Sequence, residues 1–321
     1  MNKPITNQDE LWQGLDYMVA ELLKERKCEE ALHAAEEALQ IAEETYPLNH
    51  KNIVVSLTTM AKAFAACDMK EPAEIFYDRA LETARDAFGA NSIDVAALIN
   101  DFATLMIMNE KNEQAAMLFK QAAAILQQAP VSRPKLMAAT LTGMAKIYEA
   151  EEKYDYAESL YNKALQVYLN AYGTDHLSVA DAMDALAKFY QNRSNYDKAV
   201  RFFGKVMKIR EQSLGEEHPM IIKSINDLAT LNLQLKKYDY AETFCARAVK
   251  ILVKTHGRNN IDVAHALEKL VTVCMIQGKY AEAQPFCERA LGIFEQKMEP
   301  KHPTMIRMSD KLGKIIENIR Q

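Results

Sequence analysis

A period of 42 residues runs through the whole of this chain. Small residues recur at one phase in seven successive copies, at Ala38, Ala80, Ala122, Ala164, Val206, Ala248 and Ala290. A second set keeps the same spacing at Ala31, Ala73, Ala115, Ala157, Ala199, Ala241 and Ala283. Neither set is interrupted by an insertion or a deletion. A strict period of this length is the signature of stacked structural repeats, each too small to bury its apolar face alone.

Each period contains two helical patterns. In residues 153–176 the apolar side chains recur at three- and four-residue steps, which is the spacing of one helix face, and Gly173 follows as a helix-ending residue. Upstream of each such segment lies a pair of a large and a small residue, such as Leu186-Ala187 and Leu228-Ala229. The sequence therefore predicts an all-α, right-handed superhelical solenoid of seven helix–turn–helix units at 10–303. A disordered segment at 1–9 precedes them, and a capping helix at 304–321 follows.

Composition and charge exclude several classes of protein. The net charge of −5 argues against nucleic-acid binding, which normally needs a strong basic patch. No segment approaches the roughly 20 apolar residues of a membrane span, and the first residues lack the apolar core of a signal peptide. The five cysteines show no CxxC motif and no paired spacing, which fits a reducing compartment. We therefore expect a cytoplasmic protein.

Residues suited to catalysis or metal binding are scattered. Four of the seven histidines, His50, His176, His218 and His302, occupy the same position in different repeats. A full repeat separates each from the next, so they cannot share a metal ion. Cys245 and Cys287 stand at equivalent positions and are predicted to fill the core. With no glycine-rich phosphate loop and no nucleophile motif, we expect no enzyme activity, no cofactor and no metal.

The repeat unit resembles the tetratricopeptide repeat (TPR). The residues that carry this resemblance are Leu228-Ala229, Lys237-Tyr238, Ala241 and Ala248. The 42-residue period, the GEEHP linker at 215–219 and the segment GKYAEAQPFCERALGI at 278–293 look like the longer kinesin-light-chain variant, and the resemblance covers about residues 10–321. It implies protein binding. Kinesin light chains also carry a heptad segment before the array, and because only about ten residues precede it here, a stand-alone adaptor is the better fit.

The resemblance also implies where a ligand would bind. In this family the first helix of each repeat lines a concave groove. Two adjoining positions on that helix are polar in nearly all copies here, and they include Asn100, Asn226 and Lys146. This pattern fits either a solvated helix face or a surface whose asparagines bond to the backbone of an extended peptide. The positions predicted to contact a peptide are Asn100, Thr104, Ile107, Met108, Thr142, Lys146, Asp184, Lys188 and Asn226.

The N-terminal part of the predicted groove is more apolar. Val55, Ala97, Ile107 and Met108 belong to this wall, which is either a binding surface or simply packed under neighbouring helices. We expect the ligand to be an extended segment of a protein partner, with an apolar anchor near Ile107 and Met108 and an acidic residue near Lys146. Neither nucleic acid nor a membrane is expected as a partner.

Two functions remain open from the sequence. The first is an adaptor whose concave groove binds a segment of another protein. The second is an assembly scaffold that self-associates, or holds several subunits, through its convex face or its ends. Weak self-association would accompany the second function.

Overall fold

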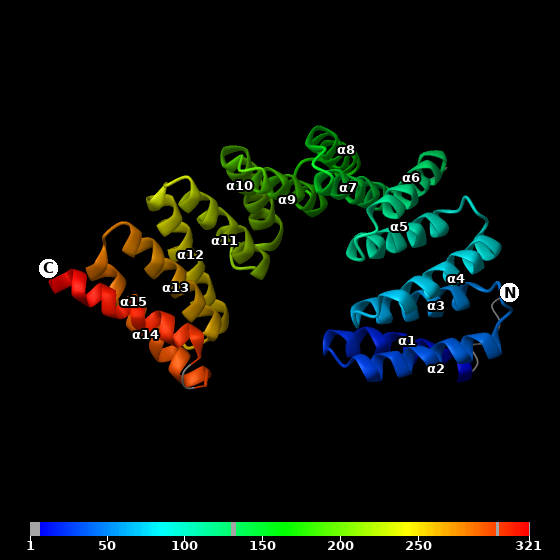
Figure 1. The fold of residues 1–321 in the computed structure, drawn as a ribbon, viewed down its shortest axis with the longest axis horizontal. Coiled ribbons are helices and arrows are strands. Elements are labelled where there is room, and N and C mark those ends of the chain that lie inside the picture. Colours follow the sequence, from blue (N-terminus) through cyan, green and yellow to red (C-terminus); the bar gives the residue numbers. More distant parts are fainter. Residues whose placement is uncertain (1–6, 130–132, 300–301, 321) are drawn as a thin grey trace. The chain divides into compact units, whose positions relative to one another are not determined.

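The fold is entirely helical in the part of the chain that the structure, a computed structural model, describes. Residues 7–129, 133–299 and 302–320 form fifteen helices and no strand (Figure 1). The helices are α1 (Asn7–Lys24), α2 (Cys28–Thr45), α3 (Lys51–Ala66), α4 (Lys70–Phe88), α5 (Ile93–Met108), α6 (Asn112–Gln128), α7 (Pro134–Ala150), α8 (Tyr154–Tyr172), α9 (Leu177–Asn192), α10 (Tyr196–Leu214), α11 (Pro219–Gln234), α12 (Tyr238–His256), α13 (Ile261–Ile276), α14 (Tyr280–Lys297) and α15 (Pro303–Arg320).

The chain divides into two compact units, unit 1 at Met1–Val167 and unit 2 at Tyr168–Gln321. Consecutive helices pack against each other from α1 to α7 in unit 1 and from α9 to α15 in unit 2, as α3 does against α4 and α13 against α14. Alternate helices also meet, because α1 contacts α3 and α5 contacts α7. Seven helix pairs followed by α15 match the predicted all-α solenoid, and this prediction is confirmed.

The turn inside each helix pair has the same backbone conformation in all seven copies. One residue adopts a left-handed conformation with φ between 56° and 62° at Arg26, Asp68, Glu110, Glu152, Ser194 and Lys236, and with φ 74° at Gly278. The next residue donates its backbone N–H five residues back, as Lys153 does to the Tyr148 carbonyl at 2.8 Å. This bond satisfies a carbonyl that the helix end leaves free. The turn therefore holds its geometry although only one copy has glycine.

The linker histidines act as helix caps. His50, His176, His218 and His302 each accept a backbone N–H through Nδ1, at 3.1–3.3 Å, from the residue two positions later. Ser92 and Asn260 occupy the same repeat position and cap their helices with oxygen. Capping the start of a helix therefore explains why the four histidines recur at one repeat position. Nowhere among the described residues do three His, Cys, Asp or Glu side chains gather as a metal site.

The core of each unit runs along the helix pairs and is built from the repeating small residues with large ones between them. Ala73, Ala80 and Ala103 in unit 1 are fully buried, and Trp12 donates from Nε1 to the Ser56 hydroxyl at 2.7 Å. In unit 2 the thiols of Cys245 and Cys287 are buried, and burial raises the pKa of each to about 11. Both therefore stay protonated at neutral pH, as core-filling cysteines should.

The ends of the array differ partly from the sequence-based prediction. α1 begins at Asn7, so residues 7–9 are helical although the predicted disordered segment is 1–9; residues 1–6 lie outside the described residues. At the other end, Met308 and Ile315 of α15 are fully buried against unit 2. The role of 304–321 as a cap stays a prediction. No described helix combines the length and apolar character needed to cross a membrane.

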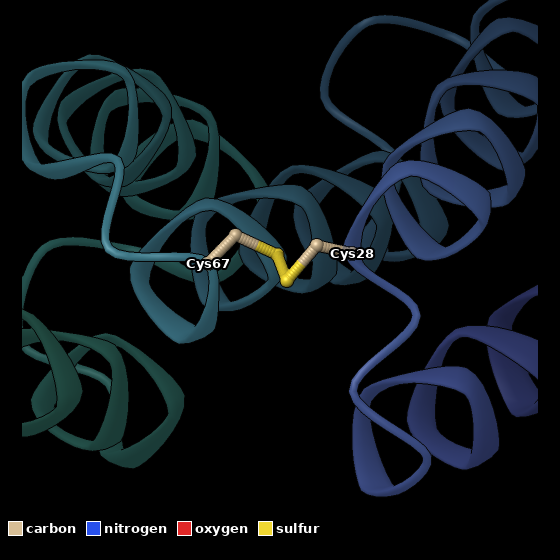
Figure 2. The surroundings of a disulfide bond; sticks show 2 residues. All are labelled: Cys28 and Cys67. Carbon is tan, nitrogen blue, oxygen red and sulfur yellow. A yellow bond between two sulfur atoms is a disulfide. The ribbon is translucent and has the colours of Figure 1, made fainter.

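A disulfide joins Cys28, the first residue of α2, to Cys67, which directly follows α3 (Figure 2). Their Cα atoms lie 5.7 Å apart. The cysteine spacing suggested no such bond, and a disulfide does not fit the reducing compartment inferred from that spacing. Their separation of 39 residues hides the pairing in the sequence, because only the packing of α2 on α3 brings one helix start beside the next helix end. The inference of a reducing, cytoplasmic compartment from unpaired cysteines therefore loses its basis.

One glycine marks the junction between α6 and α7. A Cβ atom at Gly143 would lie 2.3 Å from the Cζ atom of Phe119, whose ring is fully buried. The Phe119 side chain thus occupies the space that a side chain at position 143 would need. By contrast, nothing lies within 4 Å of a Cβ atom built at Gly204 in α10.

We predict that replacing Cys28 and Cys67 by Ser lowers the free energy of unfolding of the oxidised protein by about 3–4 kcal/mol, because a closed loop of this length restricts the unfolded chain. Urea denaturation followed by circular dichroism measures the effect. A reductant should lower the stability of the wild type to that of the double variant and leave the variant unchanged. Equal unfolding midpoints for the variant and the oxidised wild type would contradict the bond.

We also predict opposite effects for two glycine-to-alanine substitutions. Gly204→Ala should stabilise the protein by about 0.5–1 kcal/mol, because alanine has the higher helix propensity and meets no obstacle. Gly143→Ala should destabilise it by about 1–3 kcal/mol, because the Phe119 ring must move. Thermal melts of the two variants side by side test this. Stabilisation by both would show that Phe119 does not limit position 143.

Candidate functional site

The polar side chains on the first helices of the repeats form a ladder of contacts between neighbouring repeats. In unit 1 the Thr59 hydroxyl on α3 donates to a carboxylate oxygen of Asp16 on α1 at 2.6 Å. The Lys62 ammonium group pairs with the Asp101 carboxylate on α5 at 2.7 Å. The first contact joins residues 43 positions apart, one repeat plus one residue. A step of 43 residues therefore connects a predicted polar position on the first helix of one repeat to the first helix of the next repeat.

The same ladder recurs in unit 2. The Lys269 ammonium donates to the amide oxygen of Asn226 at 2.9 Å, again across 43 residues. Glu268 accepts from Lys311 at 3.2 Å and from Arg307 at 2.8 Å. Burial alone would raise the pKa of the Glu268 carboxyl, but Arg307 and Lys311 outweigh it and lower that pKa. The amide oxygen of Asn226 is thus already bonded within the protein.

Asp184 is also committed to internal contacts. It is buried, pairs with the ammonium group of Lys188 one turn later, and lies 3.5 Å from the buried guanidinium of Arg210. Burial disfavours the charged form of Lys188, but the hydrogen bond and charge of Asp184 prevail and raise the Lys188 pKa. Arg210 also donates to the Ser224 hydroxyl at 3.0 Å. This cluster ties α9, α10 and α11 together.

The ladder is broken at Asn100 on α5. This residue is only 7% exposed, and its side-chain oxygen Oδ1 is buried without a hydrogen-bond partner among the described residues. The position that would supply its partner on α7, 43 residues later, is Gly143, which has no side chain. Phe119 fills the space there, as described above. An unpaired buried amide oxygen costs about 1–3 kcal/mol, so Asn100 is a candidate for bonding to something outside the chain.

Five further predicted contact residues belong to unit 1. Three follow Asn100 on α5, and two lie on α7, which packs against α5. Met108 is 61% exposed and Ile107 is partly buried against the core of unit 1. Thr104 is exposed, and its hydroxyl donates to the Asn100 backbone carbonyl of its own helix at 2.9 Å. On α7, Thr142 is half-buried and Lys146 is exposed. We call these six residues of α5 and α7 the α5–α7 surface.

An open groove lies beside this surface, between α3 and α5. It encloses about 530 Å³ and is lined by Lys51, Val54, Val55, Thr58, Thr59, Lys62, Phe88, Asp94, Ala97, Leu98 and Asp101. Val55 and Ala97 of the predicted apolar wall are among them. The sequence did not indicate Phe88, because it belongs to the end of α4 and reaches the groove only through the packing of α4 on α5. We call this cavity the α3–α5 groove.

The nine predicted peptide-contact residues thus fall into two groups. Six belong to the α5–α7 surface of unit 1, whereas Asp184, Lys188 and Asn226 belong to unit 2. The carboxylate of Asp184 and the amide oxygen of Asn226 are engaged inside unit 2. The amide oxygen of Asn100 has no such partner among the described residues. Peptide contact by any of these residues stays a prediction.

The solved structures similar to this chain include the following three. BtubC (BKLC) from P. vanneervenii matches with a TM-score of 0.55 and 18% identity, over 78% of this chain and 93% of that one. A putative kinesin light chain with nearly identical TPR-like repeats from Podosopora anserina matches with a TM-score of 0.52 and 17% identity, over 63% and 96%. The apo form of RapI matches with a TM-score of 0.64 and 15% identity, over 90% and 78%. At such identities the likeness shows the fold alone.

Sequence comparison gives the family. No match was found among curated protein sequences. Two family models, both described as the tetratricopeptide repeat, match this chain: one at residues 179–219, 221–262 and 263–304, the other at 136–188. Together they cover just over half of its 321 residues. The chain therefore belongs to the tetratricopeptide repeat family.

Proposed function

We propose that this chain is a non-catalytic adaptor that binds an extended segment of another protein across the α5–α7 surface and the α3–α5 groove of unit 1. Repeats of this family generally serve as protein-binding modules. The observation that carries the proposal is the buried, unpartnered Oδ1 of Asn100 at the break in the ladder. Because this oxygen is enclosed in the structure, a backbone N–H of an extended peptide would satisfy it only once a neighbouring side chain turns aside.

The rest of the surface supports a peptide as the ligand. Met108 offers an exposed, adaptable apolar contact on the same helix as Asn100. The α3–α5 groove adds an apolar subsite around Val55 and Leu98. Lys146, exposed on α7, would attract an acidic side chain. Because α5 and α7 pack against each other and packed helices lie about 8–10 Å apart, a segment that crosses these two helices needs about three extended residues, and more to reach the α3–α5 groove.

Affinity and selectivity would come from different groups. Bonds to the peptide backbone act on any sequence, whereas the apolar contact and the lysine discriminate between sequences. Exposed charge pairs contribute only about 0–1 kcal/mol each, so we expect binding that weakens moderately as salt increases. The ammonium group of Lys62 is already paired with Asp101 and would add little.

Two asparagines at the same repeat position provide the test. A library of random twelve-residue peptides is screened against the full chain, and the best binder is titrated by calorimetry. We predict that Asn100→Ala weakens this peptide about tenfold, the effect of losing one buried hydrogen bond. Asn226→Ala is the matched control and should bind as the wild type does, because that amide already bonds to Lys269.

Stability distinguishes a lost ligand contact from a damaged fold. Asn100→Ala should leave the melting temperature unchanged or raise it, because it removes an unsatisfied buried group. Met108→Glu, at an exposed position, should weaken the same peptide without lowering the melting temperature. If Asn226→Ala weakens binding as much as Asn100→Ala does, or if no peptide is selected, the α5–α7 surface is not the site.

Two exposed apolar residues support the alternative scaffold function. Ile75 on α4 and Met117 on α6 occupy the same repeat position, 42 residues apart, and are 65% and 71% exposed. Exposed apolar side chains that recur on the second helices favour self-association or contact with a further subunit. Sedimentation over a range of concentrations separates the functions, because an adaptor alone stays monomeric.

A further inference from the structure

The outer side of α10 in unit 2 carries a row of basic side chains. Lys198, Arg201, Lys205 and Lys208 follow each other at three- and four-residue steps, so they lie along one stripe of the helix about 15 Å long. All four are exposed. Within the described part of the chain, Arg201, Lys205 and Lys208 make no ion pair or hydrogen bond. Their positive charge is therefore not neutralised by a partner in this region.

Aromatic rings hold part of this stripe in place. Tyr190 of α9 stacks on Phe202 of α10, with ring centroids 5.6 Å apart. The Lys198 ammonium lies 4.6 Å from the centroid of the Tyr190 ring, and the Lys205 ammonium lies 5.8 Å from that of Phe202. Such contacts restrict long, flexible side chains and so lower the entropy lost when they bind an anion. The two ammonium groups are thus partly positioned before any ligand arrives.

The same residues line an open cavity. Tyr190, Lys198, Arg201, Phe202 and Lys205 surround about 560 Å³, with two rings and three cationic groups in the lining. Asp197 precedes the stripe and Glu211 follows it, so the basic area is confined to this part of the helix. We call these residues together with Lys208 the α10 basic site.

Comparison with the other repeats shows that Lys198 and Arg201 are particular to α10, whereas the position of Lys205 is also basic in four other repeats, at Arg79, Lys163, Arg247 and Arg289. The residues of α12 equivalent to Lys198 and Arg201 are Tyr240 and Thr243. In α4 the residue equivalent to Lys208 is Glu82. The repeat fold therefore does not require cations at the positions of Lys198 and Arg201. Their combination in α10 calls for an explanation beyond packing.

We propose that the α10 basic site binds an acidic segment of a partner polypeptide, independently of the α5–α7 surface. Charge complementarity identifies the ligand, because several carboxylates in an extended chain can reach successive cations along the stripe. Nucleic acid fits less well. The chain carries a net charge of −5, and the basic area is one short stripe rather than the broad surface that follows a phosphate backbone.

Fluorescence anisotropy of the full chain with a fluorescein-labelled nonaglutamate peptide tests this proposal. The double variant Arg201→Glu/Lys205→Glu should weaken binding at least about tenfold, because two attractive contacts become repulsive. Arg201→Gln/Lys205→Gln, which removes charge without reversing it, should weaken binding by less. For the wild type, affinity should fall as salt increases from about 0.05 to about 0.3 M.

A matched control separates a local site from net charge. Lys250→Glu/Lys314→Glu changes the net charge of the chain equally, at two exposed lysines outside the stripe, and should bind as the wild type does. If the control weakens binding as much as Arg201→Glu/Lys205→Glu does, net charge alone explains the effect and the proposed site is wrong. The proposal is also overturned if a labelled single-stranded oligonucleotide binds more tightly than the peptide. Melting curves confirm that each variant is folded.

Discussion

The close approach of neighbouring helices, made possible by small residues at a fixed phase, is the constraint on which every other feature rests. Fully buried alanines such as Ala73, Ala80 and Ala103 let each helix contact both its partner in the pair and the helix of the next repeat. The left-handed turns and the histidine caps then start and stop the helices in register. Because the register is exact, a residue at one position meets the same neighbouring position in several copies.

That regularity turns the polar helix faces into a ladder between repeats. Asp16 meets Thr59, Asn226 meets Lys269 and Glu268 meets Lys311, always one repeat plus one residue away. A functional surface then arises where the regular pairing fails. At Asn100 the neighbouring position is Gly143, which Phe119 keeps free of a side chain, and a buried amide oxygen stays unpaired. A core packing requirement on one helix thereby creates an unsatisfied polar group on another.

The two proposed sites differ in chemistry because they belong to different kinds of helix. The α5–α7 surface uses the first helices of its repeats, with one unpaired amide, apolar contacts and a single exposed lysine. The α10 basic site uses the second helix of a repeat, where Lys198 and Arg201 add two cations beside Lys205, whose position is basic in other repeats too.

The sequence alone determined the fold, because a 42-residue phase with two helical patterns per period leaves one way to bury the small residues. It also identified the polar rows and the core role of Cys245 and Cys287. It could not distinguish Asn100 from Asn226, which occupy the same position and differ only in what the next repeat presents. Nor could it pair Cys28 with Cys67, which only the packing of α2 on α3 brings within 5.7 Å. Contacts across neighbouring repeats depend on two residues and on the space between them, and only the tertiary structure decides both.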